Sequence, residues 1–182
     1  MIKTPFLPMR PTPAERLTPD NILAVVGEYR ARGWIEQRKL NGDSGTLEST
    51  KDGLKLWNRY GSIYAASGVK LNPWLGLPVG SILGGEIYQG EFRCFEVIQH
   101  LTEPLETASQ RIAFAYPLCQ QYSQPYIFGN VTNDWLMGEV TLKANPKTRM
   151  FEGLVWRLAS AKYTPMKQPH HECPTIYKTK WS

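Results

Sequence analysis

Apolar positions first recur with a helical period, most clearly between Leu17 and Gly33. Four apolar side chains follow the i, i+3, i+4, i+7 spacing, namely Ile22, Val25, Val26 and Tyr29. Thr18 is an N-cap residue by type, and Gly33 is the residue type that most often ends a helix. The pattern therefore predicts an amphipathic helix that serves packing rather than chemistry.

After residue 33 the apolar period changes to two, which predicts strands. Hairpins are indicated around Asp52-Gly53 and around Gln89-Gly90, because these pairs are turn formers between alternating segments. Two more strands are predicted at 150–158 and 175–181, and a second helix is predicted to begin near Pro104. Lys39 lies at the end of another stretch in which apolar and polar residues are mixed. It is either an ordinary residue at the end of a strand or a lysine whose ammonium group points into a pocket.

The chain is organised as an extended, proline-rich arm at 1–17 followed by one domain at 18–182. No repeat or shift in composition marks a second domain. The arm carries three basic residues and is interpreted either as a plain tail or as a contact for nucleic acid.

Composition narrows the class of protein. With 42% hydrophobic and 20% charged residues, the chain is globular rather than disordered. Its net charge of +5 favours a polyanionic partner, although a merely soluble basic protein has the same signature. The N-terminal segment lacks the continuous apolar stretch of a signal peptide, and the uncharged run at 71–85 is broken by prolines and glycines.

The cysteines and histidines indicate no metal framework. Three cysteines without a CxxC pair are typical of a reducing compartment, so a cytoplasmic protein without a membrane segment is expected. The PHHECP stretch at 169–174 offers two histidines and one cysteine, but zinc sites usually draw on two separated pairs. We interpret this stretch as a loop before the last strand.

Charged side chains within or beside the predicted strands carry the candidate chemistry, because a charge on a half-buried strand needs a partner or a purpose. They are Lys39, Arg59, Glu86, Glu96, Glu152, Lys178 and Lys180. If they converge on one cleft, cations would hold phosphates and carboxylates would hold a divalent metal or a ribose. The alternative is a set of ordinary charges on surface strands.

Six short segments then occur in a fixed order: KLNG at 39–42, WNRYG at 57–61, GGEI at 84–87, FEVI at 95–98, EGLV at 152–155 and IYKTKW at 176–181. This ordered set, spread over residues 34–181, resembles the motifs of the nucleotidyltransferase domain of ATP-dependent DNA and RNA ligases, the superfamily that includes mRNA capping enzymes. The resemblance implies an α+β fold of antiparallel sheets flanked by helices, described as ATP-grasp-like. It also implies ATP and Mg²⁺ or Mn²⁺ as cofactors.

The same resemblance implies a nucleotide site made of Gln37, Arg38, Lys39, Arg59, Glu86, Phe95, Glu152, Lys178 and Lys180. Lys39 would be the nucleophile that carries AMP, with Lys178 and Lys180 as catalytic partners. Arg38 would add to the surrounding positive charge. The glycine at 42 would let the backbone come close to the nucleotide. The backbone bend after Lys39 would then direct its ammonium group into the pocket.

Roles for the remaining positions follow from the same motifs. Arg59 would contact a phosphate or the ribose, and Phe95 would stack on the adenine. Glu86 would accept hydrogen bonds from the ribose hydroxyls, and Glu152 with Glu86 would help to place the metal ion. Gln37 would help to read the purine edge.

Several positions depart from the family pattern. Asn41 replaces the usual aspartate of the first motif, Gly84 replaces the aspartate of the third, and Ser44 stands where many DNA ligases have arginine. The chain ends at the last motif, so no C-terminal OB-fold domain is expected. The segments PLETASQR and SAKYTP resemble DNA ligases, whereas Ser44 favours RNA ligases.

The leading hypothesis is a minimal, monomeric ATP-dependent polynucleotide ligase, DNA ligase-like, that seals nicked or broken nucleic acid in DNA repair or replication. It would need the basic face of its own domain, the arm or a partner protein to hold that substrate. Alternatives are an RNA ligase, a GTP-dependent guanylyltransferase, and a non-catalytic nucleic-acid-binding relative of ligases.

Overall fold

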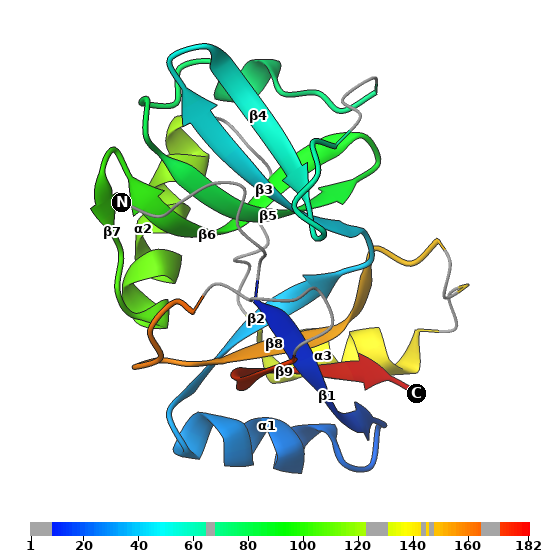
Figure 1. The fold of residues 1–182 in the computed structure, drawn as a ribbon. Helices are drawn as coiled ribbons and strands as arrows, with labels where there is room; N and C mark the ends of the chain where they lie inside the picture. Colours follow the sequence, from blue (N-terminus) through cyan, green and yellow to red (C-terminus); the bar gives the residue numbers. More distant parts are fainter. Residues whose placement is uncertain (1–8, 65–67, 123–130, 143–144, 146–147, 165–171) are drawn as a thin grey trace.

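The strands of the chain form two separate sheets (Figure 1). The computed structural model describes residues 9–64, 68–122, 131–142, 145, 148–164 and 172–182. One sheet has four strands in the spatial order β1 (Arg10–Leu17), β9 (Glu172–Trp181), β8 (Phe151–Leu158) and β2 (Trp34–Leu40). The other has five in the order β4 (Gly53–Asn58), β3 (Asp43–Thr50), β5 (Ile82–Tyr88), β6 (Glu91–His100) and β7 (Glu103–Pro104).

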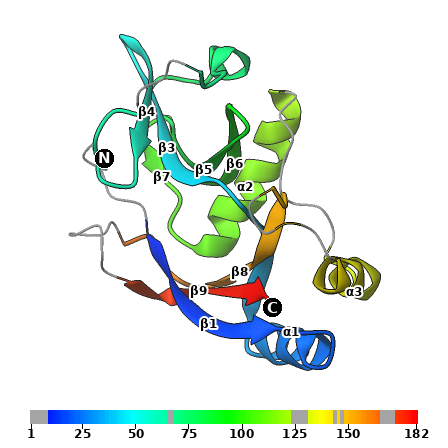
Figure 2. The same ribbon diagram turned by 90° about the vertical axis from the view of Figure 1, so that its right-hand side faces the viewer.

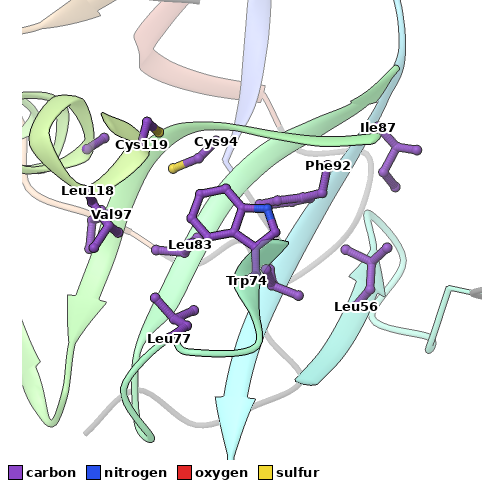
Figure 3. Packing of buried hydrophobic residues seen from close by; sticks show 12 residues of the cluster. Leu56, Trp74, Leu77, Leu83, Ile87, Phe92, Cys94, Val97, Leu118 and Cys119 are labelled. Carbon is purple, nitrogen blue, oxygen red and sulfur yellow. The ribbon is translucent and has the colours of Figure 1, made fainter. Parts of the chain in front are cut away.

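Each sheet has its own helical cover and hydrophobic core. Helices α1 (Ile22–Ala31) and α3 (Asn133–Thr141) pack with Trp156 against the four-stranded sheet, and Figure 2 shows both helices beside it. Helix α2 (Ala108–Gln121) covers the five-stranded sheet together with the short 3-10 turn η1 (Asn72–Trp74). Figure 3 shows the fully buried Trp74 among the side chains of this second core. The predicted α+β class, with largely antiparallel sheets flanked by helices, is confirmed.

Both predicted hairpins are confirmed. β3 pairs with β4 across the turn that precedes Gly53, whose φ of +113° requires glycine. β5 pairs with β6 across Gln89 and Gly90, both with positive φ, as a two-residue hairpin turn requires. The two late strands are also confirmed, and β9 begins at Glu172, earlier than the pattern predicts.

Both helix starts were predicted too early. Helix α1 begins at Ile22 because Leu17 ends β1 and a tight turn follows, in which Asn21 binds the Thr18 backbone N–H through its side chain. Thr18 is therefore not the N-cap. Helix α2 begins at Ala108, where Thr107 and Gln110 form a capping box.

Two features of the fold were not predicted from the sequence. Helix α3 was not predicted, although Thr132 caps it and Asp134 lies in its first turn. The pairing of residues 10–17 was not predicted either: they form β1, which pairs in parallel with β9. The first eight residues and both histidines of the PHHECP stretch lie outside the described residues, whereas Cys173 belongs to β9. No helix in the described part of the chain is long and apolar enough to cross a membrane.

Candidate nucleotide site

A cavity of about 560 Å³ is lined by residues of both sheets. The four-stranded sheet contributes residues of β1, β2, β8 and β9, and the five-stranded sheet contributes residues of β3, β5 and β6. All nine site residues predicted from the sequence line it: Gln37, Arg38, Lys39, Arg59, Glu86, Phe95, Glu152, Lys178 and Lys180. Segments far apart in the chain therefore meet at one cavity. Six of the seven charged strand positions line it, whereas Glu96 does not.

Strand register places Lys39 and Lys180 at one level of the four-stranded sheet. Gly153 on the central strand β8 lies opposite Lys39 of β2 on one side and Lys180 of β9 on the other. The register between β2 and β8 shifts after Lys39, so that Glu152 is an extra residue on β8. Such a bulge redirects a side chain that strict alternation would turn to the opposite face.

Glu152 joins the two lysines. Its Oε1 accepts a hydrogen bond from Lys39 Nζ, and its Oε2 accepts one from Lys180 Nζ at 2.6 Å. Burial raises the pKa of Glu152, but the hydrogen bonds from Lys180 and Lys39 outweigh burial and hold this pKa below its ordinary value. The carboxylate therefore stays charged and fixes both ammonium groups.

Lys178 extends the positive charge of this wall. It lies two residues before Lys180 on β9, on the same face of the sheet. Burial and repulsion from Lys39, Arg10 and Lys180 lower the pKa of Lys178. Because these cations repel one another, a polyanion bound among them would be stabilised by their positive charge.

Glu86 lies on the opposite wall, on β5. Burial raises its pKa to about 7, although Lys39, the Gly42 backbone N–H and Arg59 each lower it. Arg59 lies beside the cavity with its guanidinium 3.9 Å from the Asp43 carboxylate, and both of these side chains are largely exposed. Arg59 is therefore held only weakly before a ligand arrives.

Gly42 is required by the protein's own packing. A Cβ at this position would collide with the backbone carbonyl of Ile87 on β5. One close approach that selects glycine is therefore made to a neighbouring strand, and Gly42 also lines the cavity, as its expected approach to a nucleotide requires. The turn between β2 and β3 is pressed against β5, which carries Glu86.

The asparagine at 41 also has a structural reason. Its side-chain amide donates to the Arg149 carbonyl at 3.2 Å, and its backbone N–H donates to the Met150 carbonyl at 3.0 Å. An ionised aspartate cannot make the first of these bonds, because a carboxylate has no donor. Asn41 thus ties the turn after Lys39 to the beginning of β8.

Phe95 and Gln37 form the end of the cavity next to a buried arginine. The Arg157 guanidinium lies 4.9 Å from the centre of the Phe95 ring. The Gln37 amide donates to the Phe95 carbonyl at 2.8 Å and accepts from Arg157 Nε at 2.9 Å. A Cβ on Gly84 would lie 3.2 Å from the Phe95 ring, so an aspartate here would crowd that ring.

Arg38 belongs to the cavity wall, but its guanidinium is not directed to the lysine cluster. Consecutive strand residues point to opposite faces, and Arg38 follows this rule relative to Lys39. Its guanidinium lies over the Trp135 ring of α3, 4.5 Å from the ring centre, and near the Phe151 ring. Arg38 therefore packs the helix-covered side of the sheet.

The donor set suits a magnesium ion bound together with phosphates. Among the described residues, no group of three or more His, Cys, Asp or Glu side chains is arranged to hold a metal. Mg²⁺ typically needs only one or two carboxylates and completes its shell with water and substrate phosphates. Glu86 and Glu152 line the same cavity and supply such oxygens.

The lining residues that were not identified from the sequence include Arg10, Tyr60 and Arg157. Arg157 had a detectable signal, because it follows Gly153 and Val155 at every second position of β8. Arg10 had none, because only the pairing of β1 with β9 brings the N-terminal segment to the site.

The fold is shared with ligase domains in solved structures. The ligase domain of M. tuberculosis LigD matches with a TM-score of 0.67 at 16% identity, over 96% of this chain and 59% of that one. A mycobacterial DNA ligase D complexed with ATP and MES matches with a TM-score of 0.64 at 16% identity, over 96% and 60%. An archaeal ATP-dependent RNA ligase matches with a TM-score of 0.52 at 16% identity, over 94% and 48%.

No family model matches the sequence, and no curated protein matches it either. The chain spans about 60% of the length of the two mycobacterial structures. At 16% sequence identity, what this chain shares with these structures is the fold. The fold of this chain is thus that of the nucleotidyltransferase domain of ATP-dependent ligases.

Proposed function

We propose that the chain is an ATP-dependent polynucleotide ligase that acts through a covalent lysyl-AMP at Lys39. The observation that carries this proposal is the position of Lys39 Nζ in a cavity of about 560 Å³, fixed by Glu152 and flanked by Lys178 and Lys180. An amine in a cavity rich in cations is suited to attack a phosphate, because the cations stabilise the charge that develops on its oxygens.

In the first step, Lys39 reacts as a neutral amine after losing one proton to water. Its Nζ forms a bond to the α-phosphorus of ATP, and the bond from this phosphorus to the oxygen that bridges to the β-phosphate breaks. Pyrophosphate leaves with that electron pair, and the second amine proton is released to water. Lys180 and Lys178 lie on the same face of β9 and would hold the phosphate oxygens during this transfer.

The opposite wall would hold the nucleoside. Phe95 offers its ring to the base, Glu86 accepts hydrogen bonds from the ribose hydroxyls, and Arg59 contacts a phosphate or the ribose. We assign Gln37 to positioning, because both ends of its amide are already bonded to Phe95 and Arg157. Glu86 and Glu152 would hold Mg²⁺ or Mn²⁺, which when bound neutralises phosphate charge.

In the second step the 5′-phosphate of a broken strand attacks the phosphorus of lysyl-AMP, and the P–N bond to Lys39 breaks as the amine regains a proton. In the third step the 3′-hydroxyl attacks the activated 5′-phosphate, loses its proton and expels AMP. We place DNA first as the substrate, because the PLETASQR and SAKYTP segments resemble DNA ligases. The fold likeness extends to RNA ligases, which makes nicked RNA the comparison substrate.

The decisive test is the intact mass of the purified chain after incubation with ATP and Mg²⁺. We expect a gain of one AMP, absent in Lys39→Ala and retained in Lys51→Ala, which removes an exposed lysine from the β3–β4 turn. Equal labelling of the Lys39→Ala protein would place the nucleophile elsewhere. Salt-dependent binding to nicked duplex without any adduct would favour a non-catalytic relative.

A second assay separates the remaining alternatives. The same mass measurement with GTP in place of ATP distinguishes a guanylyltransferase, for which we expect no adduct here. The adenylated protein is then mixed with nicked DNA and nicked RNA duplexes, and sealed product is measured for each. Faster sealing of RNA would move the assignment from a DNA ligase to an RNA ligase.

A further inference from the structure

The first described strand brings an additional arginine to the nucleotide cavity. β1 lies beside β9 in parallel, with Arg10 paired to Glu172 and Pro13 paired to Lys178. Arg10 lines the cavity together with its neighbours Met9 and Pro11. It belongs to none of the six motifs that carry the resemblance to ligases.

Contacts on both sides of Arg10 hold it in place. Met9 is 8% exposed and packs in a small apolar cluster with Cys173 and Ile176. On the other side, the Thr12 hydroxyl donates to the Cys173 carbonyl at 3.0 Å. Arg10 therefore sits on a fixed backbone at the cavity rather than on a loose tail.

The charge around Arg10 is positive and incompletely balanced. Lys39 and Lys180 share the carboxylate of Glu152. In the part of the chain that the structure describes, neither Arg10 nor Lys178 forms a salt bridge. Arg10 is one of the cations that lower the pKa of Lys178, whereas the Glu172 carboxylate, whose residue pairs with Arg10, raises it. The two cations repel each other across one wall of the cavity, and a phosphate group between them would remove this repulsion.

We propose that Arg10 is a phosphate-binding residue that β1 adds to the site beside Lys178, and that it binds a phosphate other than the α-phosphate of ATP. A guanidinium suits this task because its planar fork binds two phosphate oxygens at once. The phosphate belongs either to the β,γ end of the triphosphate or to the 5′ end of the broken strand. Naming these two sources of the phosphate rests on the proposed ligase function, whereas the proposal that Arg10 binds a phosphate does not.

The first experiment uses inorganic tripolyphosphate as the probe and measures its dissociation constant by calorimetry. We expect Arg10→Ala to weaken binding at least about fivefold and Arg10→Lys to weaken it less, because lysine keeps the charge without the fork. Arg16→Ala is the matched control, since it removes the same charge from an exposed position of β1 outside the cavity. An equal melting temperature for the variants shows that β1 remains docked.

The second experiment assigns the phosphate. If Arg10 holds the β,γ end, Arg10→Ala slows formation of lysyl-AMP from ATP about tenfold or more, while preformed lysyl-AMP protein passes AMP to a nick at the normal rate. If Arg10 holds the 5′-phosphate, adduct formation is normal and the transfer to the nick is slowed.

The two proposals fail in different ways. If Arg10→Ala matches Arg16→Ala in tripolyphosphate binding and in both rates, the role of Arg10 is refuted. If wild-type protein binds tripolyphosphate through Arg10 but never forms an adduct, the ligase proposal fails and the phosphate site stands.

Discussion

Glu86 and Glu152 are two carboxylates in one cavity whose surroundings act on them in opposite directions. Glu152 accepts hydrogen bonds from two lysines, which outweigh its burial and keep its pKa low. Glu86 is affected most by burial, and its pKa rises to about 7. Near neutral pH the Glu152 carboxylate is therefore charged, whereas Glu86 is close to half protonated.

The raised pKa of Glu86 predicts how the stability of the free protein depends on pH. The folded state holds a proton on Glu86 up to about pH 7, whereas the unfolded chain releases it near 4.5. Since the folded state binds more protons in this window, the free energy of unfolding falls as pH rises from 4.5 to about 7. The contribution of Glu86 is on the order of 3 kcal/mol, fully present below the window and lost above it.

Glu86→Gln tests this prediction, because glutamine keeps the shape and cannot ionise. Urea unfolding of both proteins at pH 5 and pH 8 gives the difference directly. We expect the wild type to lose more stability than the variant between these two pH values. Parallel losses would show that burial does not raise the pKa of Glu86 as described.

At the scale of a single element, β8 determines where Glu152 points. Gly153 has a φ of +155°, and a Cβ there would collide with the Thr179 carbonyl of β9. The glycine of this motif is thus needed for the close pairing of β8 with β9 beside the bulge. That pairing sets the level at which Lys39, Glu152 and Lys180 meet.

Gly153→Ala should therefore damage both stability and chemistry. We expect a loss of about 2–4 kcal/mol in the free energy of unfolding, from backbone strain and from the collision with β9. Adduct formation at Lys39 should fall more steeply than the folded fraction, because Glu152 is displaced from the two lysines. Urea unfolding and intact mass measure the two effects.

A helical glycine provides the comparison for this variant. Gly138 lies in α3, and a Cβ there would meet no atom within 4 Å. Gly138→Ala should leave adduct formation unchanged and raise stability by about 0.5–1 kcal/mol, the usual preference of a helix for alanine. If Gly153→Ala behaved like Gly138→Ala, the close pairing of β8 and β9 would not be what selects glycine at 153.

For the molecule as a whole, the sequence predicts local pattern better than it predicts assembly. The two hairpins follow from turn residues, and the convergence of the charged strand positions follows from the ordered motifs. The roles of β1 and Arg10 could not be predicted, because a parallel pairing between the two ends of the chain leaves no local signal. The helix starts were misplaced because Thr18 and Pro104 are also good residues for a turn and for a short edge strand.

A buried charged cluster connects the two sheets through one carboxylate. Glu96 on β6 accepts from Arg111 of α2 at 2.8 Å and from Arg157 of β8 at 3.2 Å. All three side chains are 5% exposed or less. Arg157 in turn stacks on Phe95 and bonds Gln37, so this cluster supports one end of the cavity.

Glu96→Ala should consequently be among the most damaging substitutions of a residue that does not line the cavity. It would leave two buried guanidinium groups without their carboxylate, a situation that costs about 3–5 kcal/mol. Glu91→Ala on the same strand is the control, because Glu91 pairs with Arg93 at 3.2 Å with its side chain 35% exposed, and such pairs contribute about 1 kcal/mol or less. Urea unfolding measures both variants, and a loss for Glu96→Ala no larger than that for Glu91→Ala would mean that apolar packing alone joins the two sheets. A loss of the expected size, with a weaker affinity for ATP in the variant that remains folded, would show that this cluster both joins the sheets and positions Phe95.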